Sequence, residues 1–134
     1  MERVPRVAEL NHTIVWCSDK RRSAAFVVEI LGLSPARTFF HFLVVDLDNR
    51  VSLDFLEKEG AVSPQHYAFL VSDGEFDAAF SRIKERGLEY WADPARTQAG
   101  QINRHFGGRG VYFRDPDDHL LELITRPYGA DDEL

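Results

Sequence analysis

Two stretches of the chain share one order of apolar and polar positions. The first runs from His12 to Asp19 and the second from His66 to Asp73, and each passes from a histidine through five mostly apolar residues to Ser-Asp. Each is followed by apolar residues at helical spacing that end near a glycine, Gly32 or Gly87. This repeat of a strand and a helix predicts a protein of two similar modules, with a site at the junction between them.

The first module is expected to hold a strand, a helix and a β-hairpin. Alternation over the first stretch places His12 on a mostly apolar face of a strand, and the helix after it is expected to pack on the sheet. Two strand-like runs follow, residues 39–47 and 50–56. Asp48 and Asn49 between them predict a tight turn, because both residue types tolerate a positive φ.

The second module restarts at His66 with the same strand pattern. Apolar residues at i, i+3, i+4 and i+7 from Phe76 to Ile83 predict an amphipathic helix, which Asp73 is expected to cap. The final hairpin is expected from residues 110–114 and 119–125, separated by a short turn rich in aspartate.

The segment between that helix and the final hairpin has little periodic pattern. Residues 88–91 favour a short strand, whereas residues 93–110 carry four glycines and a proline and predict a long loop. A loop of this length in a small domain is typical of a lid or a binding loop. The chain ends in an acidic tail, residues 126–134, which is expected to be solvated.

These elements predict a single α+β domain. Module one spans about residues 8–57, module two residues 65–125, and a linker of residues 58–64 joins them. Each module supplies a strand, a helix and three further strands. Two small sheets are therefore expected to face each other or to curve into one cup, with the helices outside.

Composition narrows the class of protein. A chain of 134 residues, 44% hydrophobic and 28% charged, is expected to form one globular domain that needs no disulfide or metal for stability. The single cysteine, Cys17, excludes an intramolecular disulfide and fits a reducing compartment. Residues 1–6 do not resemble the core of a signal peptide, and no apolar run is long enough to span a membrane. A cytoplasmic protein without membrane binding is therefore expected. The net charge of −6 argues against nucleic-acid binding, which needs a basic face.

One carboxylate stands in an apolar setting. Glu122 has apolar neighbours on both sides of the final strand, and a buried carboxylate is costly unless it is paired, protonated or bound to a metal. His12, His66 and Glu122 come from three different strands, and two histidines with one carboxylate leave open positions on a divalent metal. Asp54 is the candidate fourth ligand, because the residues around it resemble those around Glu122. Asp54 is offset by one residue from the position in module one that corresponds to Glu122, so a β-bulge is predicted if the two carboxylates are equivalent.

Each of these residues also has a structural alternative. A single strand histidine is more often a hydrogen-bonded structural residue than a ligand, and Glu122 has a possible ion-pair partner in Arg114 on the neighbouring strand. Two histidines at the same position of two repeats, together with a central carboxylate, favour the metal site over these alternatives.

Four motifs carry a resemblance to a known family. They are Leu10-Asn11-His12-Thr13, Arg22-Ser23 followed by Phe26 and Leu31-Gly32-Leu33, His66-Tyr67-Ala68-Phe69, and the run from Val111 to Leu123. On these motifs the chain resembles the vicinal oxygen chelate superfamily, which includes glyoxalase I, extradiol dioxygenases, fosfomycin-resistance transferases and bleomycin-binding proteins. It departs from the family pattern at Asp118, where a glycine is usual, and at Val27, where an aromatic residue is frequent.

The resemblance implies paired βαβββ modules and a metal held by His12, His66 and Glu122. The metal of this family chelates two vicinal oxygens of a substrate and stabilises an oxyanion as it develops. Iron, zinc, nickel and manganese all remain open. Small members commonly form homodimers, often with a site built from both chains, so a homodimer is expected, and the ligands come from either one chain or two.

The reaction stays open, because this scaffold hosts several chemistries. A glyoxalase-type isomerase needs a carboxylate base, for which Asp54 and Glu122 are the candidates. An extradiol dioxygenase needs iron(II) and a nearby histidine and tyrosine. The candidates for these two roles are His105, Tyr112, His41 and Tyr67. We expect a metal-dependent glyoxalase- or dioxygenase-like enzyme that acts on a small substrate with vicinal oxygens.

Two alternatives remain beside that expectation. A fosfomycin-resistance-like transferase handles an anion and needs cations near the metal. The candidates, unless they form a solvated face, are Arg104, His105, Arg109 and Arg114. A bleomycin-resistance-type protein binds a drug or antibiotic in an aromatic groove without catalysis. The aromatic residues available to line such a groove are Trp16, Phe39, Phe42, Trp91 and Phe106.

Overall fold

The computed structural model describes residues 7–129 of the chain. Its first module contains β1 (His12–Cys17), α1 (Lys20–Leu31), β2 (Arg37–Phe39), β3 (Phe42–Asp46) and β4 (Ser52–Glu57). Its second module contains β5 (His66–Leu70), α2 (Asp73–Glu85), β6 (Tyr90–Trp91), the short 3₁₀ turn η1 (His105–Gly107), β7 (Gly110–Arg114) and β8 (Leu120–Ile124). The expectations for residues 1–6 and for residues 130–134 of the acidic tail lie outside the described residues.

The two modules form two four-stranded sheets of the same topology. The strand order is β1-β4-β3-β2 in one sheet and β5-β8-β7-β6 in the other. In each sheet the first strand pairs parallel with the last strand of its module, and the other pairs are antiparallel. The predicted α+β fold of two βαβββ modules is confirmed.

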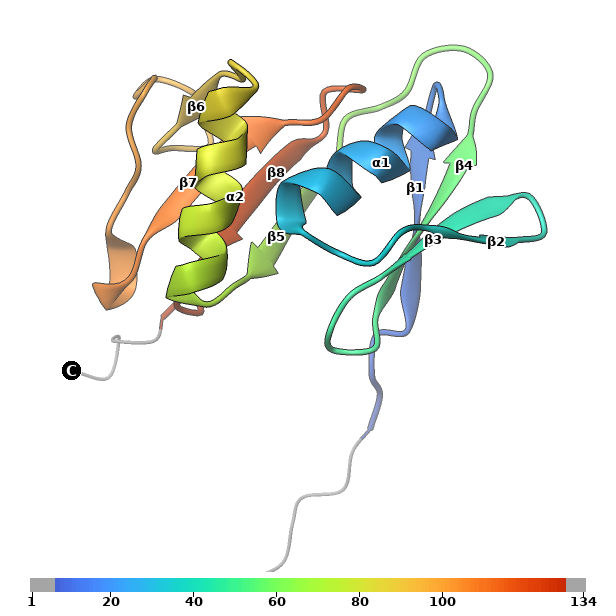
Figure 1. Ribbon diagram of the computed structural model, residues 1–134, viewed down its shortest axis with the longest axis horizontal. Coiled ribbons are helices and arrows are strands. Elements are labelled where there is room, and N and C mark those ends of the chain that lie inside the picture. The colour runs from blue at the N-terminus through green and yellow to red at the C-terminus, as the bar shows by residue number, and fades with distance from the viewer. Residues whose placement is uncertain (1–6, 130–134) are drawn as a thin grey trace, which may run out of the picture.

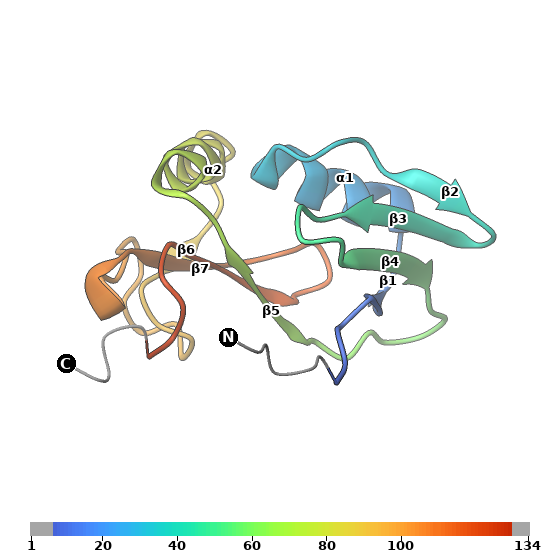
Figure 2. The same ribbon diagram turned by 90° about the horizontal axis from the view of Figure 1, so that it is seen from below.

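Both helices lie on the same side of the molecule. In Figure 1, α1 and α2 lie side by side in front of the sheets, and Figure 2 shows both helices on one side with the strands beneath them. Each sheet therefore has one face toward the helices and one face turned away from them. The predicted single cup is not confirmed, because the two sheets remain separate.

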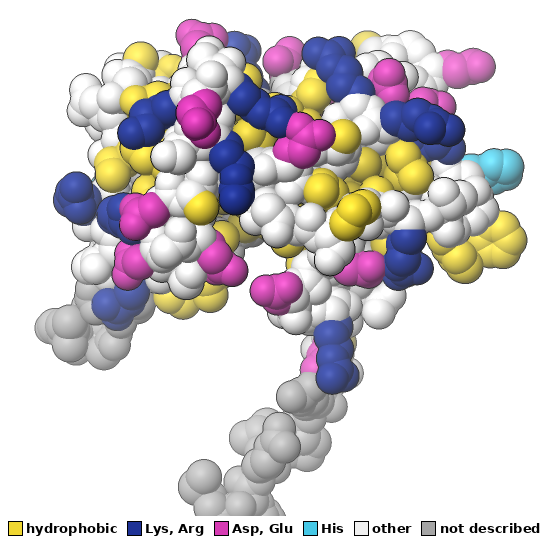
Figure 3. Space-filling model, in the orientation of Figure 1, with side chains coloured by type: hydrophobic (Ala, Val, Ile, Leu, Met, Phe, Trp, Pro, Cys, Tyr) yellow, Lys and Arg dark blue, Asp and Glu magenta, His cyan; other side chains and the backbone are white. Residues whose placement is uncertain are grey.

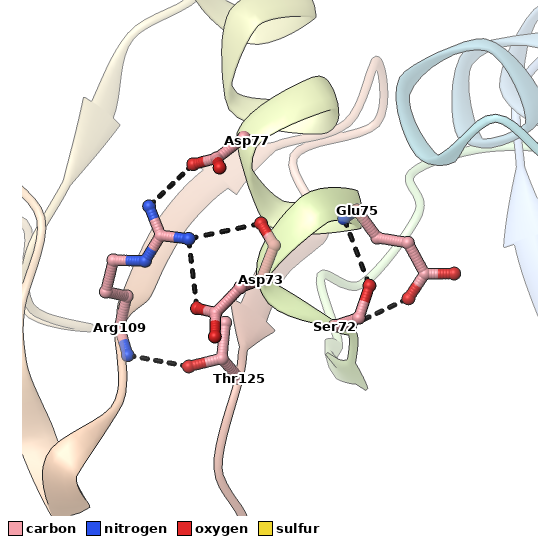
Figure 4. A network of polar contacts seen from close by, with 6 residues as sticks. All are labelled: Ser72, Asp73, Glu75, Asp77, Arg109 and Thr125. Atoms are coloured by element: carbon pink, nitrogen blue, oxygen red, sulfur yellow. Dashed lines mark hydrogen bonds and ion pairs between the residues drawn. The ribbon is translucent and has the colours of Figure 1, made fainter.

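Local chemistry sets the ends of the helices. The Asp19 side chain accepts two backbone N–H groups of the first turn of α1, and Gly32 ends this helix with a φ of 71°. Ser72 caps α2, because Ser72 and Glu75 exchange the two hydrogen bonds of a capping box (Figure 4). The prediction that Asp73 caps this helix is therefore wrong. No helix in the described part of the chain is long and apolar enough to cross a membrane.

One hydrophobic core joins the modules. The helix-facing sides of the strands and the inner faces of both helices contribute its buried residues. Its largest fully buried members are Phe55, Phe76, Phe113, Ile30, Ile83 and Leu123. Each such side chain stabilises the fold by about 1.5–3 kcal/mol through burial. Arg82 also links the helices, because its Nη1 donates to the carbonyl of Ile30 at 3.0 Å.

A buried histidine ties the β7–β8 turn to the first module. His119 is 0% exposed, its Nδ1 accepts the backbone N–H of Gln65 at 2.9 Å, and its Nε2 donates to the carbonyl of Trp16 at 2.8 Å. These partners place the ring proton on Nε2. In the same turn, the Asp117 carboxylate accepts the backbone N–H of Ser18 at 3.1 Å. The strand that carries Glu122 is thus positioned relative to β1.

The structure differs from three local expectations. The strand expected over residues 39–47 is broken by a two-residue turn in which Phe40 has a φ of 52°. Apolar composition hides this turn, because a bulky residue rarely adopts a positive φ. In the next hairpin the positive φ falls on Arg50, at 67°, and not on the predicted aspartate or asparagine. The strand expected over residues 88–91 is reduced to β6.

Candidate metal centre

The strand register makes Asp54 and Glu122 equivalent positions. On β4, Asp54 lies opposite the residue two positions after His12 of β1. On β8, Glu122 lies opposite the residue two positions after His66 of β5. Both pairs lie on the sheet face turned away from the helices, since the alternate residues belong to the core. The register is continuous through Asp54, so the predicted bulge is wrong.

His66 and Glu122 are in direct contact. Nε2 of His66 lies 3.1 Å from Oε1 of Glu122. Nδ1 of the same ring lies 2.9 Å from the carbonyl of Leu120, which only accepts, so this partner assigns the proton of the neutral ring to Nδ1. Nε2 then directs its lone pair toward the carboxylate, so the two groups present acceptor atoms to the same space, as ligands of one cation do. A histidine that donates its other N–H to a carbonyl is the usual form of a metal ligand, so the pair fits a divalent metal.

Two tyrosine hydroxyls complete the surroundings of Glu122. The Tyr128 hydroxyl lies 2.7 Å from Oε1 and 2.6 Å from Oε2 of Glu122, which is 1% exposed. The Tyr112 ring stacks on His66 with centroids 6.0 Å apart, and its hydroxyl lies 3.2 Å from that of Tyr128. Burial raises the pKa of the Tyr112 hydroxyl, and its hydrogen bond with Tyr128 acts in the same direction. Tyr112 therefore keeps its proton at neutral pH.

Tyr128 was missed by the reasoning from sequence. It lies in the tail that was expected to be solvated, and the available signal was a lone aromatic residue in a polar stretch. The alternative that Glu122 pairs with Arg114 is wrong, because Arg114 donates to Glu89 at 3.0 Å, while Tyr128 and His66 contact the Glu122 carboxylate.

The candidate ligands of module one lie apart from this pair. His12 is exposed, with Nδ1 2.8 Å from the side-chain oxygen of Asn11. Asp54 is 9% exposed and accepts the Ser52 hydroxyl at 2.8 Å. Within residues 7–129, no three His, Cys, Asp or Glu side chains gather into a metal site. One chain thus presents two separate groups of candidate ligands, which we call the module-one half-site (His12 and Asp54) and the module-two half-site (the His66–Glu122 pair).

Arg109, a predicted anion-binding residue, is engaged with α2. Its guanidinium binds Asp77 at 2.7 Å and Asp73 at 3.0 Å (Figure 4). It also lies 4.5 Å from the ring centre of Phe76. Figure 3 shows Lys and Arg side chains interspersed with Asp and Glu across the helix-bearing face. Exposed His105 contacts the ring of the neighbouring phenylalanine. Arg109 and Arg114, two of the four predicted cations, are thus paired with acidic residues of their own chain.

Replacing Arg109 by alanine is expected to lower the free energy of unfolding by about 1–2 kcal/mol, because the partly buried ion pairs and the contact with an aromatic ring are lost. Urea unfolding followed by circular dichroism measures the change. Arg104→Ala is the matched control, since Arg104 is exposed, and it should change stability by less than about 0.5 kcal/mol. Equal stability of both variants would mean that the contacts of Arg109 do not support the fold.

A row of apolar side chains crosses the first sheet on the face turned away from the helices. The strand register pairs Trp16 with Leu56 and Phe39 with Phe42, and Phe42 and Leu56 each directly adjoin the pair Leu43–Phe55. Trp16 is 40% exposed and Phe39 is 52% exposed, so the row is open to solvent at both ends. Three of the five predicted groove residues therefore lie together. Trp91 is buried in the second sheet, and Phe106 packs against Tyr128 with ring centroids 5.8 Å apart.

Comparison with known proteins identifies the family. The sequence model described as the Glyoxalase/Bleomycin resistance protein/Dioxygenase superfamily matches residues 9–123. The chain belongs to this superfamily. The resemblance to vicinal oxygen chelate proteins, inferred from the four motifs, is thereby confirmed.

Relatives within the superfamily include transferases and oxidases. Glutathione transferase FosA of Serratia marcescens is 32% identical over 120 residues, which cover 85% of this chain and 78% of that protein. Metallothiol transferase FosB of Shouchella clausii (strain KSM-K16) is 38% identical over 121 residues, which cover 87% of this chain and 79% of that protein. The solved structure of Oxidase ChaP-H1 is 58% identical with a TM-score of 0.90, and the match covers 92% of this chain and 99% of that one. Oxidase ChaP-H2 is 53% identical with a TM-score of 0.91, covering 93% and 98%.

Proposed function

We propose that this protein is a metal-dependent oxidase of the dioxygenase type that acts on a small molecule with vicinal oxygens. The observation that carries the proposal is the contact of His66 Nε2 with Glu122 Oε1 at 3.1 Å, with the other ring nitrogen bonded to a carbonyl. The choice of oxidation follows the similarity to Oxidase ChaP-H1, at 58% identity over 92% of this chain. Iron(II) suits both a set of two histidines with one carboxylate and chemistry with oxygen.

The metal would supply a Lewis acid that takes two vicinal oxygens of the substrate and stabilises negative charge as it develops. His66 and Glu122 would hold it in this chain. The protonated Tyr112 hydroxyl, next to this pair, would supply a hydrogen-bond donor to a substrate oxygen. Asp54 would supply a further carboxylate as ligand or base. The apolar row that contains Trp16 would bury the rest of the substrate.

In this proposal the complete site lies between two copies of the chain. The module-one half-site of one copy faces the module-two half-site of the other, and a twofold axis makes two identical sites. Exposed apolar residues beside each half-site support this arrangement, since Ile14 on β1 is 37% exposed and Leu70 on β5 is 61% exposed. Covering both by a partner removes apolar surface from water and stabilises the dimer.

A thiol transferase of the fosfomycin-resistance type is the second candidate. The identities of 32% with FosA and 38% with FosB support it. Such an enzyme needs cations near the metal, yet Arg109 and Arg114 bind acidic residues of their own chain. The anion-handling reaction therefore has less support than oxidation. A drug-binding protein without catalysis has the least support of the three candidates, because such a protein does not require a metal-binding pair such as His66 and Glu122.

Anaerobic loading with iron(II) tests the proposed function. The loaded protein should bind nitric oxide and give the EPR signal of an iron–nitrosyl complex, because protein ligands leave open positions on the metal. Catechol, a small molecule with vicinal oxygens, should change that signal, and the same mixture should consume oxygen in air. His66→Ala should weaken iron binding by roughly 100-fold.

The matched control is His41→Ala, since His41 is an exposed histidine in the turn between β2 and β3. It should bind iron as the wild type does. Protein that binds no iron would refute the iron-dependent oxidase. Thiol transfer to fosfomycin without a response to catechol would favour the transferase.

A further inference from the structure

The residue that shields Glu122 from solvent comes from the segment after β8. Glu122 is 1% exposed, whereas Tyr128, whose hydroxyl contacts it, is 59% exposed. Tyr128 therefore forms an outer layer over a carboxylate. We propose that the Tyr128 hydroxyl is a cap that holds this carboxylate in the metal-free chain and leaves it when a divalent metal enters. The inference rests on the metal site proposed above.

The position of the hydroxyl makes it a competitor of the metal. Tyr128 Oη lies 2.7 Å from one carboxylate oxygen of Glu122 and 2.6 Å from the other, so it sits between them. A carboxylate offers about four lone-pair sites, and a hydroxyl shared in this way covers the two that face each other. A cation chelated by the carboxylate takes the same place. A residue that only supported a bound metal would instead contact the oxygen that faces away from it.

The cap also meets a need of the metal-free state. A buried carboxylate without a partner destabilises the fold, and His66 contacts only one of its oxygens, at 3.1 Å. The Tyr128 hydroxyl shares its one proton between both oxygens and so stabilises the buried carboxylate before a metal arrives. Metal loading satisfies the same oxygens, so the cap is no longer required.

The chain around the cap has a fixed base and an exposed end. At Thr125, the hydroxyl accepts the backbone N–H of Arg109 at 2.8 Å, and the backbone N–H donates to the carbonyl of Arg109 at 3.0 Å (Figure 4). Arg126 and Pro127 join this base to Tyr128, and all three residues after the base are exposed. Rotation of the backbone after Thr125 would carry the Tyr128 ring away while β8 stays in its sheet.

The long loop holds the cap in place. Phe106 packs against the Tyr128 ring with centroids 5.8 Å apart, and it does so with a φ of 57° and a ψ of 29°. Left-handed backbone is unfavourable for a bulky residue, so the surroundings must hold Phe106 in this conformation. The loop of residues 92–109 thus acts on the metal site through Tyr128, which is a positioning residue for Glu122.

Tyr128→Phe tests the cap, because it removes the hydroxyl and keeps the ring. Titration of the metal-free dimer with zinc, in competition with a coloured chelator, should show about tenfold tighter binding than the wild type, the equivalent of one charged hydrogen bond. Phe106→Ala should tighten binding by a smaller factor and provides a second variant if the first fails to fold. Tyr90→Phe is the control, since Tyr90 packs on Phe80 with centroids 5.0 Å apart on the helix side, and it should bind zinc unchanged.

A second measurement follows the movement itself. The four tyrosines can be labelled with 3-fluorotyrosine, and the resonance that is missing in Tyr128→Phe reports on the cap. This resonance should move toward the position of a solvent-exposed tyrosine as zinc is added, while the resonance assigned through Tyr90→Phe stays in place. Weaker or unchanged zinc binding by Tyr128→Phe, or a stationary Tyr128 resonance during loading, would overturn the cap and leave the metal site standing. If the wild type bound neither zinc nor iron, both the cap and the metal site would be overturned.

Discussion

Mixing His12→Ala chains with Glu122→Ala chains is expected to restore metal binding that each variant lacks alone. In the proposed dimer, each variant alone loses one ligand from both sites. In a mixed dimer, one site takes His12 from the Glu122→Ala chain. It takes His66 and Glu122 from the His12→Ala chain, so it keeps all three ligands. Random exchange makes half of the dimers mixed, and one of their two sites is intact, so metal content should reach about a quarter of the wild-type value.

The chains can be given different affinity tags, refolded together and separated, so that the metal in the mixed dimer is measured directly by elemental analysis. The matched control mixes His66→Ala with Glu122→Ala. Both changes fall in the module-two half-site, so no combination of these chains completes a site. An empty first mixture would contradict a site shared between chains, and equal recovery in both mixtures would contradict the assignment of the half-sites.

His119→Ala is expected to lower the free energy of unfolding by about 4 kcal/mol. The imidazole is 0% exposed and bridges the backbone of Gln65 to that of Trp16. Its removal leaves the N–H of Gln65 and the carbonyl of Trp16 without this partner, next to a cavity of side-chain size. Urea unfolding followed by tryptophan fluorescence measures the loss at constant protein concentration, which keeps any contribution of dimerisation equal.

His41→Ala serves as the control for this change as well, since it removes an exposed imidazole and should alter stability by less than about 0.5 kcal/mol. His119→Gln should fall between the two, because an amide can replace part of the hydrogen bonding. A loss below about 1 kcal/mol for His119→Ala would mean that this bridge does not hold the β7–β8 turn to the first module.

Much of the fold could be predicted because its signals are local. The stripe from Phe76 to Ile83 predicts α2, and the repeat of a histidine, a strand and a helix predicts two modules of one topology. The turn at Phe40 escaped prediction, because no turn residue marks it. Its backbone conformation is imposed by the pairing of β2 with β3, and this pairing is a tertiary contact.

The candidate site, like the fold, could be predicted from the sequence only in part. The residue types at His12, His66 and Glu122 are sufficient to suggest a metal, because two histidines and a carboxylate are unusual in apolar strands. The equivalence of Asp54 with Glu122 needed the strand register, since counting along the chain suggested a bulge that is absent from these pairings. The distances that support a ligand role also come from the structure.

By itself, the sequence determined the α+β class, the two modules, the superfamily and the residue types able to bind a metal, since all of these follow from periodicity and short motifs. Only the tertiary structure decided which side chains meet. In the structure, the Tyr128 hydroxyl binds the Glu122 carboxylate and Arg109 forms ion pairs with α2. The two half-sites lie apart within the described part of one chain. The physical reason is that the partner of a buried charge is set by how strands and loops pack, and sequence distance carries little information about that packing.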